Sequence, residues 1–173
     1  KGLLGSEFFA NNPTVPKDGL VAVVNMDMPV LTYAFTDIVV LGSDHSTLGQ
    51  TVDRVAASLN LVNSPDPLPE EGFFMRSDHY SFVQTGVPAI DISTGHANGG
   101  AAIWEAFLKD TYHKPNDDLS QPIDWNAAAR FAQVSAGVVR AVADADQRPL
   151  WYAGDEFGDR FAPEAEKAPR PAD

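Results

Sequence analysis

The segment Leu20–Met28, LVAVVNMDM, is a nearly unbroken apolar run rich in valine, bounded by Gly19 and Pro29. A short β-branched run of this kind is typical of a strand rather than a helix, and its continuous apolar character predicts a central strand buried on both faces. Asp27 then lies near the carboxyl end of that strand, where open α/β sheets bind ligands. A buried carboxylate without a partner is unfavourable, so Asp27 needs hydrogen bonds, a basic partner or a metal ion. A turn or helix-capping role is the commoner one for a strand-end aspartate and stays open at this point.

Strands and helices alternate along the rest of the chain. The apolar runs Asp37–Gly42 and Val87–Ser93 predict two further strands, and helical apolar spacing predicts a long helix over Asp124–Asp146. This alternation predicts a three-layer α/β/α fold with a mainly parallel central sheet. The domain is expected over residues 1–160. Residues 161–173 are proline, alanine and charge, which predicts a disordered tail.

Composition limits the classes of function. The 173 residues suit one domain, and the net charge of -12 argues against nucleic-acid binding, which needs a basic surface. No apolar run is long enough to cross a bilayer. The absence of cysteine excludes disulfides and thiolate metal sites. The sequence starts at Lys1 without an initiator methionine or a signal peptide, and we expect it to be cut from a longer protein.

A metal site in this chain has to be built from imidazole and carboxylate, a ligand set that suits zinc, manganese or cobalt. The sequence lacks the HExxH, GxSxG and GxGxxG signatures and a phosphate-binding glycine loop. Spacing alone therefore gives only a weak indication of a metal site, and a hydrogen-bonded structural role is the commoner one for each histidine. The four histidines lie in or beside predicted loops: His45, His79, His96 and His113.

Four motifs occur in a fixed order along the chain: KGLLGS at Lys1–Ser6, NMDM at Asn25–Met28, SDHYSF at Ser77–Phe82 followed by GVPA at Gly86–Ala89, and YHKPND at Tyr112–Asp117. This series resembles the carboxyl-terminal half of the co-catalytic di-zinc exopeptidases, family twenty-eight of the metallopeptidases, which includes bacterial leucyl aminopeptidases. The segment Trp151–Gly158 is similar to the end of the bacterial members. The resemblance therefore extends to about Gly158.

The resemblance implies a peptide substrate, two zinc ions and a zinc exopeptidase-like α/β/α fold that is incomplete on its N-terminal side. Asp27 matches the strand-end aspartate that binds one zinc ion, and His113 matches the histidine that binds the other. A carboxylate and a neutral imidazole are both ordinary zinc ligands. The remaining matched residues are expected in the substrate pocket or behind the metal ligands, with Asp117 orienting His113: Ser77, Asp78, His79, Tyr80, Tyr112 and Asp117.

The family motif that precedes the KGLLGS segment has no counterpart in this sequence. In the family, a Glu-Glu pair supplies the general base and a zinc ligand, and a histidine and a bridging aspartate come earlier still. The resemblance therefore implies that no catalytic residue lies in this chain and that the base lies upstream of Lys1. Because one ligand for each ion cannot hold a binuclear site, we expect the isolated chain to bind zinc poorly and to be inactive.

The favoured function is the carboxyl-terminal part of a zinc aminopeptidase. A carboxypeptidase or a glutaminyl cyclase on the same scaffold stays open, as does a non-catalytic binding domain that has lost its metal site. A carboxypeptidase needs a cation for the terminal carboxylate, and Arg76 is the one arginine near the cleft motifs. Loss of upstream strands would expose a sheet edge that the missing N-terminal half or a second copy covers. Family members are commonly exported, which favours a secreted or periplasmic location.

Overall fold

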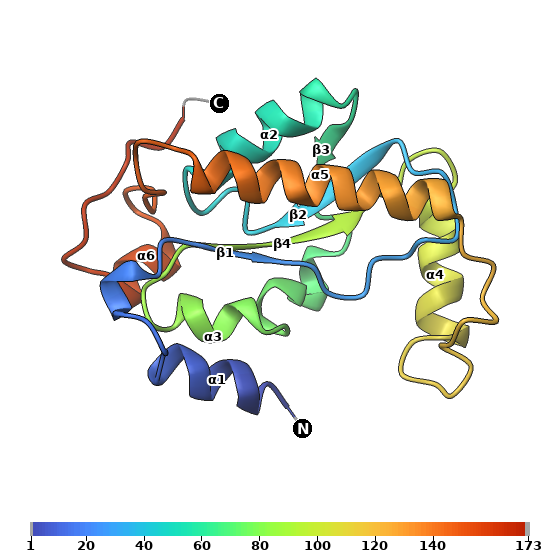
Figure 1. The fold of residues 1–173 in the computed structure, drawn as a ribbon, viewed down its shortest axis with the longest axis horizontal. Coiled ribbons are helices and arrows are strands. Elements are labelled where there is room, and N and C mark those ends of the chain that lie inside the picture. The colour runs from blue at the N-terminus through green and yellow to red at the C-terminus, as the bar shows by residue number, and fades with distance from the viewer. Residues whose placement is uncertain (1, 172–173) are drawn as a thin grey trace.

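A four-stranded sheet in the order β1-β4-β2-β3 forms the centre of the fold (Figure 1). The computed structural model describes residues 2–171. The strands β1 and β4 are parallel, as are β2 and β3, whereas β2 and β4 are antiparallel, so the expectation of a mainly parallel sheet is confirmed. The strand bounds are β1 Val23–Asn25, β2 Asp37–Leu41, β3 Val62–Ser64 and β4 Ala89–Thr94.

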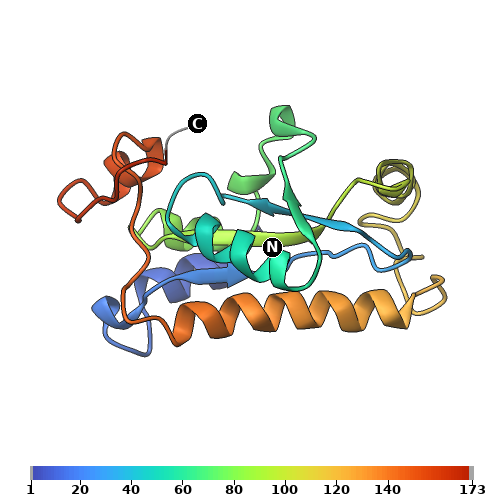
Figure 2. The same ribbon diagram turned by 90° about the horizontal axis from the view of Figure 1, so that it is seen from above.

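Helices cover both faces of this sheet, which confirms the layered α/β architecture. In Figures 1 and 2, α5 and α2 lie on one side of the sheet, and α3 and α1 lie on the other. The helix bounds are α1 Leu4–Asn11, α2 Leu48–Ser58, α3 His79–Val83, α4 Gly100–Asp110, α5 Trp125–Ala143 and α6 Glu156–Phe161. Short 3-10 turns occupy Lys17–Gly19, Pro69–Glu71 and Phe73–Met75. No described helix is both long enough and apolar enough to cross a membrane.

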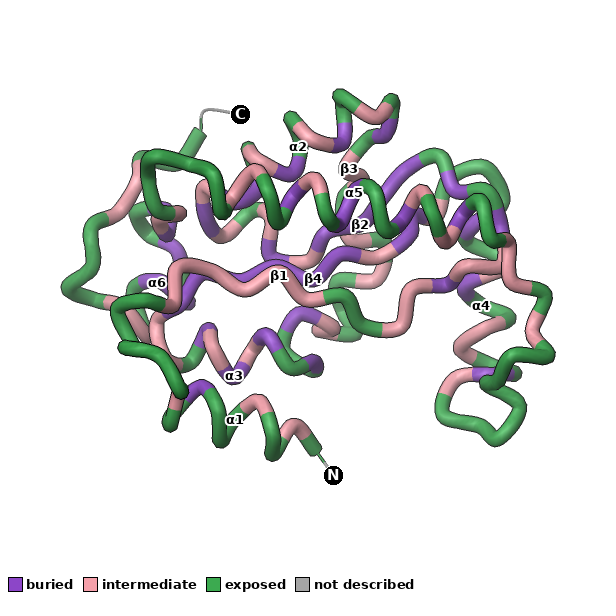
Figure 3. The backbone as a smooth tube through the Cα atoms, viewed as in Figure 1, coloured by how far each residue is buried: buried purple, intermediate pink, exposed green. Residues whose placement is uncertain are grey.

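The main core lies between the sheet and the helices α2 and α5. Ile90 and Ile92 of β4 are fully buried there against Val134 and Val138 of α5. Because side chains alternate across a strand, Ala89, Asp91 and Ser93 belong to the opposite face of the sheet. Figure 3 shows the buried stretches concentrated on the inner strands and on the sheet-facing sides of α2 and α5. The polar residues Asp91 and Ser93 of β4 thus lie on the face of the sheet opposite the main core.

The expectation of a central strand over Leu20–Met28 is wrong. Only Val23–Asn25 joins the sheet, and within residues 2–171 this strand pairs on one side alone, with β4. Its residues are half-buried rather than buried on both faces. The apolar run reflects contacts of Ala22 and Val24 with the main core on one face and of Val23 with a smaller cluster on the other. Burial from two faces does not require a neighbour on both edges.

The segment after α6 differs from the disordered tail expected from its composition. Residues 162–171 lie along the domain, where the Ala168 N–H donates to the Trp151 carbonyl at 2.9 Å and the Ala168 carbonyl accepts the Ala153 N–H at 2.8 Å. The guanidinium of Arg170 lies 3.5 Å from the buried carboxylate of Asp155. The side chains of this segment offer little apolar area to bury. Backbone hydrogen bonds and this ion pair hold the segment against the domain instead.

Candidate functional site

A cavity of about 280 Å³ lies over the polar face of β4. Its walls come from the end of β1, from β2, from the loop between β3 and α3, from α4 and from the loop that follows α4. Asp27 and His113, which are far apart in sequence, both line it. The lining includes Asp27, Met28, Val39, Leu41, Asp66, Leu68, Phe73, Arg76, Ser77, Asp91, Ser93, His96, Trp104, Tyr112 and His113.

The carboxylate of Asp27 is oriented by a side chain from the turn before α3. The hydroxyl of Ser77 donates to Asp27 Oδ2 at 2.7 Å and accepts from the Asn25 side-chain amide at 2.9 Å. Ser77 is buried, so these bonds are shielded from water. The hydroxyl of Ser77 therefore serves Asp27, and neither Ser77 nor Asp78 makes a side-chain capping bond to α3. The carboxylate of Asp27 itself is exposed toward the cavity.

Asp91 is a second carboxylate of the cavity, and the sequence reading did not single it out. Its Oδ1 accepts the backbone N–H of Asp27 at 3.2 Å, which ties the end of β1 to β4. The pKa of Asp91 is raised to about 7, chiefly by burial and also by the negative charge of Asp27, while hydrogen bonds from Asp27 and Asn25 act in the opposite direction. An aspartate in the middle of an apolar strand was the signal that could have identified it.

His79 lies behind the cavity wall rather than in it. Its ring is fully buried, with Nδ1 at 3.4 Å from the Asn25 side-chain nitrogen, and burial lowers its pKa to about 4. Tyr80 packs edge-on against Phe74 and Phe157 in the smaller core cluster. Asp78 is exposed and does not line the cavity. Of the SDHY residues, Ser77 alone reaches the cavity.

His113 projects from the loop after α4 in a left-handed backbone conformation, with φ of 58°. Its ring stacks on Tyr112 with a centroid separation of 3.8 Å and an interplanar angle of 24°, and both residues line the cavity. Asp117 faces a different cavity, between the segment 29–32 and α4. Among the hydrogen bonds of residues 2–171, none joins Asp117 to His113. The orientation of His113 here comes from Tyr112.

The donors in this cavity are of the kind that zinc binds, but their number is insufficient. Asp27 supplies a carboxylate and His113 an imidazole, both ordinary zinc ligands. Over the described part of the chain, no group of three His, Asp or Glu side chains is placed to hold a metal ion. Catalytic zinc ordinarily has three protein ligands. These residues fit a zinc site in chemistry and fall short of one in count.

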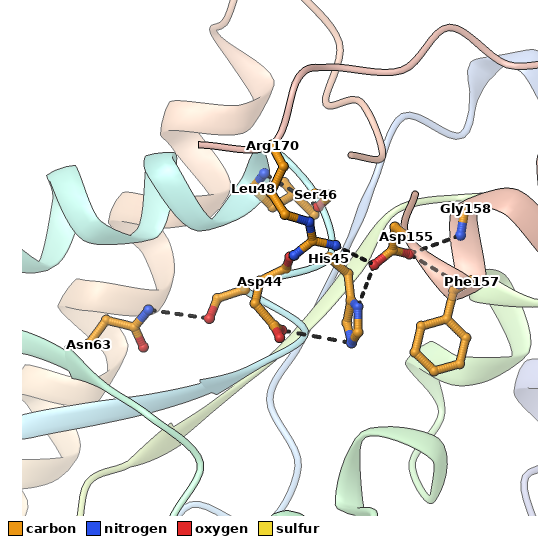
Figure 4. A network of polar contacts seen from close by, with 10 residues as sticks. Asp44, His45, Ser46, Leu48, Asn63, Asp155, Phe157, Gly158 and Arg170 are labelled. Atoms are coloured by element: carbon orange, nitrogen blue, oxygen red, sulfur yellow. Dashed lines mark hydrogen bonds and ion pairs between the residues drawn. The ribbon is translucent and has the colours of Figure 1, made fainter. Parts of the chain in front are cut away.

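A separate polar cluster fastens the carboxyl-terminal segment to the turn after β2 (Figure 4). His45 Nδ1 lies 2.7 Å from Oδ2 of Asp155, whose other oxygen accepts the backbone N–H groups of Phe157 and Gly158 at 3.1 and 2.9 Å. Asp155 thus caps α6 and binds an imidazole, with the guanidinium of Arg170 at 3.5 Å. His45 and Asp155 do not line the cavity of Asp27. We assign this cluster a structural role.

The chain matches a protein-family model. The model of peptidase family M28 matches residues 1–139, which includes every residue that lines the cavity and ends within α5. No curated protein and no solved structure gives a significant match to the chain. The segment with α6, including Asp155 and Arg170, lies outside the matched residues, whereas His45, the partner of Asp155, lies within them.

Proposed function

The chain belongs to peptidase family M28, whose members are typically zinc-dependent metallopeptidases, and from this premise we propose that it forms part of an aminopeptidase. One observation carries the proposal: Asp27 and His113 line the same cavity although they come from different halves of the matched segment. A carboxylate and an imidazole at one cavity are what a zinc hydrolase needs from this part of its fold. The substrate is accordingly a peptide.

Within this proposal, Asp27 and His113 are zinc ligands that belong to different ions. Zinc, when bound, supplies Lewis-acid polarisation of the scissile carbonyl. The contribution of this chain is to orient the proposed zinc ligands and to enclose the peptide substrate. Ser77 fixes the carboxylate of Asp27, and Tyr112 supports the ring of His113. The carboxylates of Asp27 and Asp66 give the cavity a negative potential that favours the free α-amino group of a peptide.

We propose further that the missing ligands and the general base come from polypeptide outside these 173 residues. The motivation is the ligand count, since the described residues hold no third donor at Asp27 or His113. The edge of β1 that faces away from β4 is unpaired within residues 2–171. In α1, which precedes β1 in the chain, the apolar side chain of Phe8 is 70% exposed. An upstream segment, or a second copy, that covers this edge would complete both the sheet and the site.

The test uses the protein extended by the residues that precede Lys1 in its gene. We expect zinc-dependent hydrolysis of leucyl p-nitroanilide, and about a hundredfold or greater loss of kcat/KM in Asp27→Asn and in His113→Gln. Asp117→Asn is the matched control and should retain activity, because Asp117 lines a different cavity. Full activity in Asp27→Asn would contradict the assignment. Activity lost in Asp117→Asn as well would mean that His113 depends on a contact that this structure does not contain.

A further inference from the structure

Arg76 gives the cavity a cationic group that an aminopeptidase site does not need for the reaction itself. Among the described lining residues it is the single lysine or arginine, whereas Asp27, Asp66 and Asp91 are all acidic. It directly precedes Ser77, whose hydroxyl binds Asp27. Arg76 is therefore the sequence neighbour of the residue whose hydroxyl orients the proposed metal ligand.

The present partner of Arg76 is weakly held. Nη1 donates to the side chain and to the carbonyl of Glu71, at 3.3 and 3.2 Å, and the guanidinium carbon lies 5.2 Å from the centre of the Phe73 ring. Both charged side chains are 53% exposed, and exposed ion pairs of this kind contribute little. Within residues 2–171 these bonds use Nη1 alone. The other edge of the guanidinium is available for a second carboxylate, which arginine binds through two parallel N–H groups.

Arg76 and Asp27 line the same cavity, and Ser77, the residue after Arg76, donates to the carboxylate of Asp27 at 2.7 Å. A peptide carbonyl held at Asp27 therefore lies in a cavity that Arg76 also lines. Because one residue of substrate spans at most about 3.6 Å, the terminal carboxylate of a dipeptide lies close to that carbonyl.

We propose that Arg76 binds the terminal carboxylate of a dipeptide, so that the preferred substrates are dipeptides rather than longer chains. This inference rests on the proposed peptidase function and adds a specificity-determining residue to it. The carboxylate binds at the other edge of the guanidinium, beside the negative charge of Glu71. The two residues therefore have opposite effects: Arg76 attracts the ligand carboxylate, and Glu71 repels it.

Binding can be measured on the chain as it exists, without turnover, by following its amide resonances during titration. The probes are leucylglycine, leucylglycinamide and the α-amide of leucyl-aspartic acid. Each has the free α-amino group of leucine, and only leucylglycine has a terminal carboxylate. We expect leucylglycine to bind about tenfold more tightly than leucylglycinamide, as a charge-assisted hydrogen bond allows. The aspartyl amide, which carries its carboxylate on a side chain, should bind like leucylglycinamide.

Variants separate the role of Arg76 from a general effect of charge. Arg76→Gln should abolish the preference for leucylglycine over its amide, and Glu71→Gln should increase leucylglycine affinity about threefold. Arg140→Gln is the control, because Arg140 is 84% exposed on α5 and pairs with Asp144. Equal affinity for leucylglycine and leucylglycinamide in the unmodified chain would overturn the inference and leave the proposed function standing. Tight binding of the aspartyl amide would overturn the assignment to a terminal carboxylate. No binding of any probe would also overturn the inference, because Arg76 lies within this chain, whereas the proposed function is tested separately by the turnover of the extended protein.

Discussion

Replacement of Asp91 by asparagine tests the electrostatics of the cavity through stability. Asp91 is 6% exposed, and burial raises its pKa to about 7 from an ordinary value of 3.8. Between about pH 4 and pH 7 the unfolded chain therefore binds fewer protons at this group than the folded chain does, and raising the pH across this window favours unfolding. The difference in pKa corresponds to a penalty of about 4 kcal/mol, complete above pH 7.

Asparagine removes that penalty and keeps an oxygen that can accept the Asp27 N–H. We expect Asp91→Asn to be more stable than the unmodified chain by up to about 4 kcal/mol at pH 8 and to match it near pH 4. Urea unfolding, followed by tryptophan fluorescence between pH 4 and pH 8.5, measures the difference. Asp144→Asn, at a carboxylate 70% exposed at the end of α5, is the control. A variant less stable than the unmodified chain at pH 8, or an offset that is the same at every pH, would refute the reasoning.

Three further predictions concern other parts of the fold. Burial lowers the pKa of His79 to about 4, so the folded state should lose up to about 3 kcal/mol as the pH falls from 6.5 to 4. This dependence of the unfolding free energy on pH should be visible in the Asp91→Asn variant, which lacks the opposite dependence caused by Asp91. It should vanish when His79→Gln is added, and its persistence there would be inconsistent with a neutral buried imidazole. Asp155→Ala removes the cap of α6 and the partner of His45, and should reduce stability by about 3 kcal/mol and speed tryptic cleavage at Arg160 and Lys167. An unchanged cleavage rate would argue against the fastening role. In Gly49→Ala, the new Cβ would lie 1.9 Å from the Ser43 carbonyl oxygen, and a loss of about 2 kcal/mol is expected, whereas Gly5→Ala meets nothing within 4 Å and should not destabilise. Equal unfolding midpoints for the two alanine variants would count against the close contact at Gly49.

Local patterns predicted the elements whose causes are local. The helix expected at Asp124–Asp146 is α5, and Asp124 caps it by accepting the backbone N–H groups of Asn126 and Ala127 at 2.9 and 3.1 Å. The strand expected over Asp37–Gly42 is β2. The position of Leu20–Met28 could not be read in this way, because strand order depends on which distant strand lies beside it. The pairing of Val24 with Ile90 is a property of the whole sheet.

The same distinction applies to the site. Motif order brought Asp27, Ser77 and His113 into consideration together, and the structure places all three at one cavity. Asp91 escaped notice because it sits in a strand that is otherwise apolar, and its contact with Asp27 exists only through the parallel pairing of β1 and β4. Asp66 reaches the cavity through the conformation of the proline-rich loop after β3. Residues on neighbouring strands and irregular loops carry no periodic signal.

The most direct measurement compares the turnover of leucyl p-nitroanilide, with zinc added, by the isolated chain and by the chain extended by the residues that precede Lys1 in its gene. Because the proposed ligands Asp27 and His113 would supply at most one donor to each ion, the account predicts no turnover by the isolated chain and zinc-dependent turnover by the extended protein. Robust turnover by the isolated chain, lost on Asp27→Ala or His113→Ala, would contradict it, since the remaining ligands and the base would then lie within these 173 residues.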